Sequence, residues 1–288
     1  MLSMTNTLLI TPAFTQTLIG IARAAGEAIL DIYHHPENTH IQHKQDNSPL
    51  TAADLAAHHV IVNALQAISS LPIISEEASL PDLLGLDTYW LIDPLDGTKE
   101  FIARNGEFTV NIALVQNTVP VVGVVHLPVS DETYLGVMDI VAENGKKIAK
   151  KYKNGDEIST LCTRNLSQRK EQCQSLDVLV SHRHGTDSAA LLLDKIQLRW
   201  PAPLNPLSAG SSLKFCLIAE GLADFYPRLA PTCCWDTAAA QAVLTAAGGL
   251  VLEADTRLPL RATLSSTMLN PFFFALGDAC FNWSDLLD

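Results

Sequence analysis

Apolar residues recur at helical spacing in two stretches near the start of the chain. Between residues 14 and 32 they stand three or four positions apart, which predicts an amphipathic helix. Thr11 and Pro12 precede this stretch, and a capping Thr followed by Pro at the first helical position is a typical helix start. A second helix is predicted over residues 51–68, because its first four residues, Thr-Ala-Ala-Asp, match a capping box.

The next part of the chain has the pattern of β-strands. Residues 108–115 and 119–127 alternate in polarity, are rich in β-branched side chains and are separated by Gln-Asn-Thr. Two such runs around a short polar connection predict an antiparallel hairpin. Shorter apolar runs predict two further strands, over residues 72–75 and 89–92.

A change in composition separates the two halves of the chain. Residues 139–174 are enriched in Lys, Asn, Asp and Glu, and we interpret this segment as a solvated surface extension. Helices and strands alternate again beyond it. The predicted strands cover residues 177–181 and 224–226, and the predicted helices cover residues 187–198, 211–220 and 236–247.

The mixed order of helices and strands predicts the fold class. Because it includes an antiparallel hairpin, we expect a layered fold of the α/β (α+β mixed) class rather than a doubly wound parallel sheet. No internal repeat or flexible linker divides the 288 residues. We therefore expect one domain over residues 1–288, with an N-terminal αβ half over residues 1–180 and a C-terminal αβ half over residues 181–288.

The overall charge limits the kind of partner. Hydrophobic residues make up 48% and charged residues 17% of the chain, as in ordinary globular proteins, and the formal net charge is −12. Because an acidic protein repels the phosphates of DNA and RNA, we do not expect polymeric nucleic acid as a partner. A small anionic substrate would need bound cations or a local group of Lys and Arg side chains.

The cysteines and the apolar runs bear on the cellular compartment. None of the six cysteines stands in a CxxC pair, so we interpret them as small buried hydrophobic residues in a reducing cytoplasm. No positive charge precedes the apolar residues 8–10, and no run reaches the roughly 18 apolar residues of a membrane span. We expect neither a signal peptide nor a transmembrane segment.

Residues 90–98, Trp-Leu-Ile-Asp-Pro-Leu-Asp-Gly-Thr, concentrate hard oxygen ligands after a buried strand. Pro stiffens the exit from the strand and Gly97 permits a tight turn, so the turn can direct Asp93, Asp96 and a backbone carbonyl to one point. Mg²⁺ prefers such ligands and completes its octahedron with water and substrate phosphate. The alternative is an ordinary Asp-Gly turn in which the carboxylates only cap the backbone.

Two further segments place a carboxylate where an apolar element meets a turn. Glu76 and Glu77 follow the predicted strand over residues 72–75, and Asp236 begins an Ala-rich helix. Functional residues collect at such junctions. The alternatives are a solvated loop for the two glutamates and a helix N-cap for the aspartate.

Together, these segments resemble the signatures of the inositol monophosphatase superfamily. The resemblance spans most of the chain and implies a layered α-β-α-β-α fold in one compact unit, with metal ions between its halves. It also implies a Mg²⁺-dependent phosphomonoesterase with two or three Mg²⁺ ions per active site. The four pieces that carry it, in order, are Lys44-Gln-Asp46-Asn-Ser-Pro-Leu-Thr51-Ala-Ala-Asp54, Ser75-Glu76-Glu77, Asp93-Pro-Leu-Asp96-Gly-Thr98 and Trp235-Asp236-Thr237-Ala-Ala.

The resemblance assigns metal ligands to individual residues. Glu76, Asp93 and the backbone carbonyl of Leu95 are similar to the ligands of a first Mg²⁺ ion. Asp93, Asp96 and Asp236 are similar to the ligands of a second, so that Asp93 would bridge the two. A third, weaker ion beside Glu76 is a further implication of the resemblance.

The resemblance also assigns the residues that act on water and phosphate. Asp54 and Thr98 resemble the pair that orients the attacking water. A capping box is a competing role for Asp54, and the two roles are compatible. In this assignment Glu76 is also catalytic, and Glu76, Leu95, Asp96, Gly97, Thr98 and Asp236 contact the substrate.

The expected phosphate ester rests on a segment of the C-terminal half. Residues 210–228 contain Ser-Leu-Lys-Phe and Tyr-Pro-Arg, which resemble the bisphosphate nucleotidase branch of the superfamily. A substrate with two phosphates needs cations for the phosphate that magnesium does not hold, and Lys214 and Arg228 are candidates. Their alternative roles are snorkelling from a helix and capping a loop. His184 is a further substrate-binding candidate by resemblance, although the surrounding Ser-His-Arg-His order departs from the pattern of that branch.

The branch resemblance implies hydrolysis of the 3′-phosphate of adenosine 3′,5′-bisphosphate to AMP and phosphate, a step linked to sulfate assimilation. It also implies lithium sensitivity and a cytoplasmic enzyme, with peripheral attachment to the inner membrane face as a further expectation. Two alternatives remain open. One is an inositol monophosphatase or fructose-1,6-bisphosphatase of the same superfamily, and the other is a non-catalytic metal-dependent sensor or scaffold.

Overall fold

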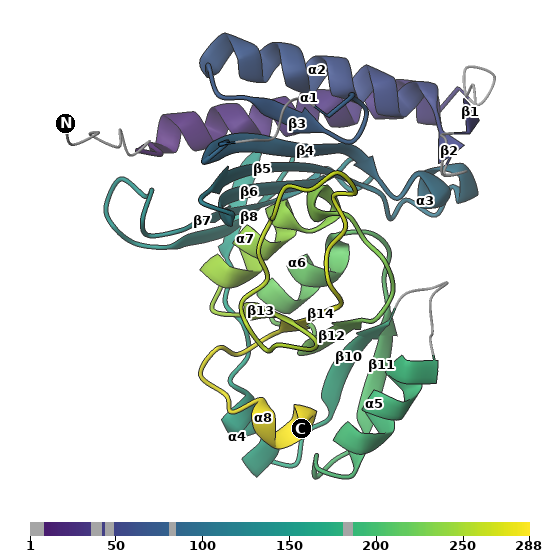
Figure 1. The fold of residues 1–288 in the computed structure, drawn as a ribbon, viewed down its shortest axis with the longest axis vertical. Helices are drawn as coiled ribbons and strands as arrows, with labels where there is room; N and C mark the ends of the chain where they lie inside the picture. The colour runs from purple at the N-terminus through teal and green to yellow at the C-terminus, as the bar shows by residue number, and fades with distance from the viewer. Residues whose placement is uncertain (1–8, 36–41, 44–48, 81–84, 181–186) are drawn as a thin grey trace.

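Helices and sheets alternate in five layers. The computed structural model describes residues 9–35, 42–43, 49–80, 85–180 and 187–288. Within these residues, a helix pair covers one face of a seven-stranded sheet, a second helix pair separates this sheet from a five-stranded sheet, and further helices cover the outer face (Figure 1). The α-β-α-β-α layering expected from the sequence is confirmed.

The outer helix pair begins where the sequence predicts. The amide of Phe14 donates to the Thr11 hydroxyl at 3.2 Å, which caps the first helix. The second helix carries the predicted capping box, in which the amide and the hydroxyl of Thr51 both contact the Asp54 carboxylate. These helices are α1 (Pro12–Tyr33) and α2 (Ala52–Ile68), and a two-stranded sheet of β1 (Gln42–His43) and β2 (Pro49–Leu50) precedes α2.

The seven-stranded sheet contains the predicted hairpin at its centre, in the strand order β3-β4-β5-β6-β7-β8-β9. All neighbouring strands are antiparallel except β3 and β4, which are parallel. The parallel pair brings the C-terminal parts of β3 and β4 to the same edge of the sheet. The strands are β3 (Ile73–Ser75), β4 (Thr88–Asp96), β5 (Thr109–Gln116), β6 (Val119–Leu127), β7 (Glu132–Val137), β8 (Ile148–Lys153) and β9 (Asp156–Thr160).

The segment over residues 139–174 is largely exposed, as its composition predicts, but it is part of the seven-stranded sheet and not an extension from it. It contributes β8 and β9 to the sheet and then forms α4 (Leu166–Glu171). In β8, Tyr152 is buried and Lys151 is only 8% exposed, with its ammonium 3.0 Å from the Glu220 carboxylate. The prediction of an extension was wrong because a lysine whose stem packs and whose charge is paired has the same composition as a solvated one.

The inner helix pair, α6 (Leu213–Ala219) and α7 (Ala238–Ala246), separates the two sheets. Two strand glycines allow α7 to lie directly on the seven-stranded sheet. A Cβ atom on Gly123 would lie 2.0 Å from the carbonyl oxygen of Ala239, and one on Gly136 would lie 2.4 Å from Cα of Val243. The alanine-rich sequence of α7 follows from this close approach, because larger side chains would not fit between helix and sheet.

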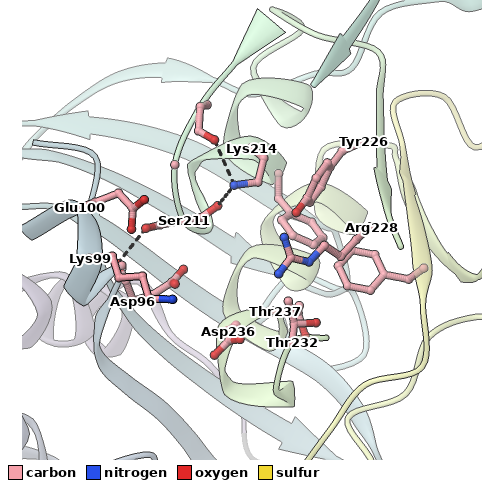
Figure 2. A pocket seen from close by; sticks show the side chains of 15 residues that line it. Asp96, Lys99, Glu100, Ser211, Lys214, Tyr226, Arg228, Thr232, Asp236 and Thr237 are labelled. Carbon is pink, nitrogen blue, oxygen red and sulfur yellow. Dashed lines mark hydrogen bonds between the residues drawn. The ribbon is translucent and has the colours of Figure 1, made fainter. Parts of the chain in front are cut away.

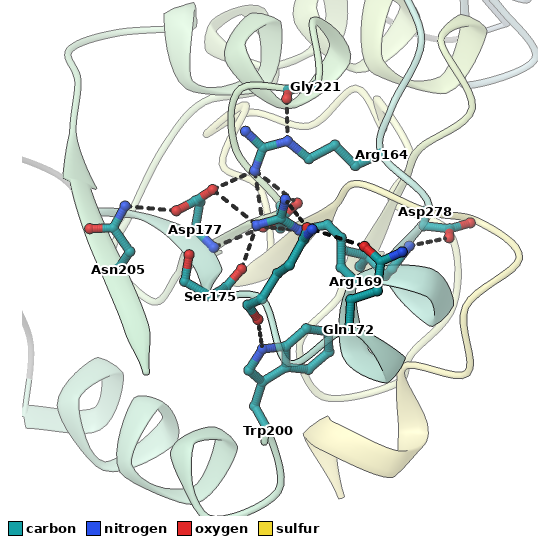
Figure 3. A network of polar contacts seen from close by, with 12 residues as sticks. Arg164, Arg169, Gln172, Ser175, Asp177, Trp200, Asn205, Gly221 and Asp278 are labelled. Atoms are coloured by element: carbon teal, nitrogen blue, oxygen red, sulfur yellow. Dashed lines mark hydrogen bonds and ion pairs between the residues drawn. The ribbon is translucent and has the colours of Figure 1, made fainter. Parts of the chain in front are cut away.

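The second sheet has the strand order β11-β10-β12-β14-β13, with β10 parallel to β11 and β12. A buried ionic network fastens α4 and the preceding chain to this sheet: Arg164 and Arg169 both bind the Asp177 carboxylate (Figure 3). The elements of this part are β10 (Leu176–Val180), α5 (Asp187–Gln197), β11 (Leu204–Ser208), β12 (Phe225–Arg228), β13 (Leu250–Glu253), β14 (Phe273–Leu276) and α8 (Ser284–Leu287).

The exposure of the cysteines differs in part from the prediction. The six cysteines are free, but only Cys216 and Cys234 are buried, whereas Cys162, Cys173 and Cys280 are exposed. The prediction that cysteines act as buried hydrophobic residues is therefore wrong for these three.

Across the described residues, every helix is too short or too polar to cross a lipid bilayer.

Candidate active site

Strand pairing brings the first two acidic segments together. In the parallel pair of β3 and β4, Ser75 lies opposite Ile92, so the next residues, Glu76 after the end of β3 and Asp93 within β4, lie side by side. The amide of Glu76 donates to the carbonyl oxygen of Ile92 at 3.2 Å, which fixes this alignment. Two carboxylates that lie 17 residues apart in sequence thus reach one edge of the sheet.

An irregularity in β4 directs Asp93 and Asp96 to the same side. In a regular strand, residues three positions apart point to opposite faces. Here Asp93 pairs with Asn111 and Asp96 pairs with Thr109, so three steps along β4 match two steps along β5. Asn111 and Thr109 share a face because they are two apart, and the extra residue in β4 brings both aspartates to that face.

The third acidic segment directly precedes α7 of the inner helix pair. Asp236 ends a short 3₁₀ turn, η2 (Cys234–Asp236), and its carboxylate accepts a hydrogen bond from the amide of Cys233 at 2.9 Å. It is not the N-cap of α7, since Thr237 occupies that position. The ligand oxygens of Glu76, Asp93 and Asp236 all lie within 4.8 Å of one another.

The electrostatics of this group fit a divalent cation. Burial is the main cause that raises the pKa of Asp93 well above its ordinary value, and the neighbouring charges of Glu76, Asp96 and Asp236 raise it further. Burial also raises the pKa of Asp236 well above its ordinary value, and the charges of Asp96 and Glu76 add to the shift. Carboxylate oxygens at this density are the ligands that hard cations such as Mg²⁺ or Ca²⁺ prefer. A bound cation would offset the repulsion among them.

Asp96 is held by Ser212, which is not among the site residues predicted from the sequence. Its carboxylate accepts hydrogen bonds from the amide of Ser212 at 2.7 Å and from the Ser212 hydroxyl at 2.8 Å. The same hydroxyl lies 2.6 Å from the carbonyl oxygen of Asp236 and accepts from the side-chain amide of Asn111 at 2.9 Å. Burial raises the pKa of Asp96, while the Ser212 hydrogen bond and the charge of Lys214 oppose the rise.

Ser212 therefore connects two of the acidic segments with the loop before α6. The sequence signal that could have found it is the Ser-Leu-Lys-Phe piece itself, of which Ser212 is the first residue. Ser211 completes the connection, because its hydroxyl donates to the carbonyl oxygen of Asp96 at 2.9 Å. Gly97 leaves room for this contact: its φ is +96°, and an added Cβ atom would lie 2.2 Å from the Ser211 hydroxyl.

Asp54 and Thr98 are in direct contact, as their expected role requires. The Thr98 hydroxyl donates to one oxygen of Asp54 at 3.2 Å and lies 3.5 Å from the carbonyl oxygen of Leu95. The other oxygen of Asp54 binds Thr51 within the capping box. The capping-box contact and the contact with Thr98 are thus both present, one on each carboxylate oxygen.

A cavity opens beside the acidic group, between α3 (Thr98–Ala103) and the second sheet (Figure 2). Lys214 and Arg228 line it together with Asp96 and Asp236, so two of the predicted substrate-binding cations lie in one cavity with two of the carboxylates. His184 falls outside the described residues. The remaining lining residues include Gly97, Lys99, Glu100, Ser211, Tyr226, Thr232 and Phe273.

Comparisons with known proteins show the family of this chain. The family model described as "Inositol monophosphatase family" matches residues 12–272. The chain is 42% identical over 260 residues to "3'(2'),5'-bisphosphate nucleotidase CysQ" of Escherichia coli (strain K12), covering 88% of this chain and 95% of that protein. It is 43% identical over 256 residues to the protein of the same name from Salmonella typhimurium, with the same coverage. The crystal structure of CysQ from Bacteroides thetaiotaomicron superposes with a TM-score of 0.72 at 39% identity, covering 91% of this chain and 97% of that one.

Proposed function

This chain belongs to the inositol monophosphatase family, and we propose that it is a metal-dependent 3′(2′),5′-bisphosphate nucleotidase. In this proposal it hydrolyses the 3′-phosphate of adenosine 3′,5′-bisphosphate to AMP and phosphate. The observation that carries the proposal is the cavity that combines the carboxylates Asp96 and Asp236 with Lys and Arg side chains. The names of the relatives at 42–43% identity support the same activity.

In the proposed site, Glu76, Asp93, Asp96 and Asp236 hold Mg²⁺ with the carbonyl oxygen of Leu95. The bound metal supplies positive charge that lowers the pKa of a coordinated water and stabilises the leaving oxygen. The ligand oxygens of Glu76, Asp93 and Asp236 lie within 4.8 Å of one another, which supports this donor set. Ser212 keeps the Asp96 carboxylate in place through two hydrogen bonds.

The protein's own part in the chemistry is to orient the nucleophile and to bind the phosphates. The Thr98 hydroxyl donates to Asp54, so its oxygen lone pairs remain available to accept a hydrogen bond from a water molecule beside it and orient that water. Asp54 is fixed in turn by the capping box of α2, so the pair is held on a rigid helix end. Gly97, whose backbone has a positive φ, starts the turn beside which the scissile phosphate would lie.

Mg²⁺ is expected to raise the melting temperature more at about pH 8 than at about pH 5.5. In the metal-free protein, the raised pKa values of Asp93 and Asp236 mean that the folded state keeps protons that the unfolded chain releases above the ordinary value of 3.8. The free energy of unfolding therefore falls as pH rises from 3.8 through the raised pKa values. Mg²⁺ displaces these protons, so its stabilising effect grows as the carboxylates ionise. Thermal unfolding at both pH values, with K⁺ at matched ionic strength as the control, checks this. An equal shift at both pH values, or the same shift with K⁺, would contradict the metal site.

Phosphate-release assays test the activity itself. With Mg²⁺ present, we expect kcat/KM for adenosine 3′,5′-bisphosphate to exceed the values for inositol 1-phosphate and fructose 1,6-bisphosphate by at least about tenfold. The reason is that the cavity offers cations for a second phosphate. A preference for either sugar phosphate would defeat the nucleotidase proposal. No release from any of the three, with or without Mg²⁺, would favour a non-catalytic scaffold.

A further inference from the structure

The cavity holds charges of both signs. Asp96, Asp236 and Glu100 are its acidic lining residues, and Lys99, Lys214 and Arg228 are its basic ones. A bisphosphate substrate has a second, doubly charged phosphate that the metal site does not bind. The site therefore needs a cation whose donors are free to receive this group.

Lys214 is largely committed to the protein backbone. Its side chain is 5% exposed, and its ammonium donates to the carbonyl oxygens of Ala209 at 3.1 Å and of Ser211 at 2.8 Å. The ammonium also lies 5.2 Å from the centre of the Tyr226 ring. Burial lowers the pKa of Lys214 to about 8. Two of its three donors thus hold the loop that carries Ser211, which makes Lys214 a support for the acidic site.

Arg228 shares this arrangement. Its Nε donates to the carbonyl oxygen of Ala230 at 3.1 Å, and Nη2 donates to that of Pro231 at 2.9 Å. These hydrogen bonds attach the side chain to the loop after β12, on the side of the cavity opposite Asp96 (Figure 2). At least two of the five donors of Arg228 thus bind backbone oxygens.

Lys99 differs from both. It lines the same cavity, and its side chain is exposed. Among the described residues its ammonium forms no hydrogen bond or ion pair. Its neighbour Glu100 follows it directly on α3, and successive residues on a helix do not face each other. Figure 2 places the Lys99 side chain beside Asp96, within the cavity.

The position of Lys99 is also fixed relative to the chemistry. It is the residue after Thr98, at the start of α3, and the hydroxyl of Thr98 binds Asp54. A substrate whose scissile phosphate lies at the carboxylate group would present its remaining polar parts to the rest of this cavity. An ammonium with three free donors is well suited to a phosphate there.

We infer that Lys99 is a specificity-determining residue that binds the second, non-reacting phosphate of the substrate. The inference rests on the proposed nucleotidase function and names the group that selects a bisphosphate over a monophosphate. Lys214 then serves mainly to hold the loop over residues 209–211. Lys99 supplies the positive charge that binds the second phosphate.

The test compares Lys99→Gln with the wild-type protein on two substrates. For adenosine 3′,5′-bisphosphate, kcat/KM is expected to fall about ten- to hundredfold, the usual value of a hydrogen bond to a charged group. For adenosine 3′-phosphate, which lacks the second phosphate, it is expected to change by less than about threefold. Calorimetry gives a readout without turnover: the Kd for AMP, which keeps the 5′-phosphate, is expected to weaken by about tenfold or more.

Two control variants separate a specific contact from a change in net charge. Lys99→Arg keeps the charge and is expected to recover most of the activity on the bisphosphate. Lys195→Gln removes an exposed lysine of α5, outside the cavity, and is expected to leave both substrates unaffected. Equal losses on the two substrates in Lys99→Gln, or no loss on either, would overturn the inference while leaving the nucleotidase activity intact. A wild-type protein that turns over neither nucleotide would contradict the proposed function, and with it this inference.

Discussion

Asp96→Asn is expected to reduce kcat by about a thousandfold or more while leaving the fold intact. The aspartate contributes a negative charge to the acidic group, which the amide does not. An amide oxygen can still accept from Ser212, whose amide and hydroxyl lie 2.7 and 2.8 Å from the carboxylate. The circular dichroism spectrum should therefore be unchanged, and phosphate release under saturating substrate measures the loss.

The stability of this variant gives an independent check. Because burial and neighbouring charges raise the pKa of Asp93 and Asp236, removing one of these charges relieves repulsion in the metal-free protein. Metal-free Asp96→Asn is thus expected to melt at the same temperature as the wild type or higher, and to lose most of the stabilisation by Mg²⁺. A variant that keeps a tenth or more of the activity would show that Asp96 is not a metal ligand.

Thr98→Ala is expected to lower kcat about a hundred- to a thousandfold, within the usual range for a group that assists proton transfer. Its hydroxyl is the group that links Asp54 to the proposed water, at 3.2 Å from the Asp54 carboxylate. KM should change little, because alanine keeps the backbone turn and removes only the hydroxyl and a methyl group. Steady-state kinetics separates the two parameters.

Thr98→Ser is the matched control, since serine keeps the hydroxyl and should stay within about tenfold of the wild type. Asp54 is a less suitable target for this test. One of its oxygens belongs to the capping box of α2, so replacing it would also cost about 1 kcal/mol of helix stability. If Thr98→Ala and Thr98→Ser lose activity equally, the methyl group and not the hydroxyl matters, and the proposed pair is wrong.

The sequence predicted local structure best where the signal lies within one element. The start of α1 at Pro12, the capping box of α2 and the hairpin of β5 and β6 follow from neighbouring residues, and all three are confirmed. It failed for residues 139–174, where long lysine side chains concealed two strands of the sheet. The roles given to the site residues stay predictions, although the structure brings most of these residues into one place.

The sequence by itself determined which side chains are available: carboxylates at strand ends, a Gly at the turn and a Thr beside it. These residues can be recognised from the sequence because a strand end and a tight turn each depend on a few adjacent residues. Only the tertiary structure decided how they meet. The extra residue of β4 turns Asp93 and Asp96 to one face through the pairing of β4 with β5. The hydrogen bond from Ser212 to Asp96 joins residues that lie 116 positions apart. Such contacts are set by strand register and packing, since a shift of one residue reverses every side chain in a strand.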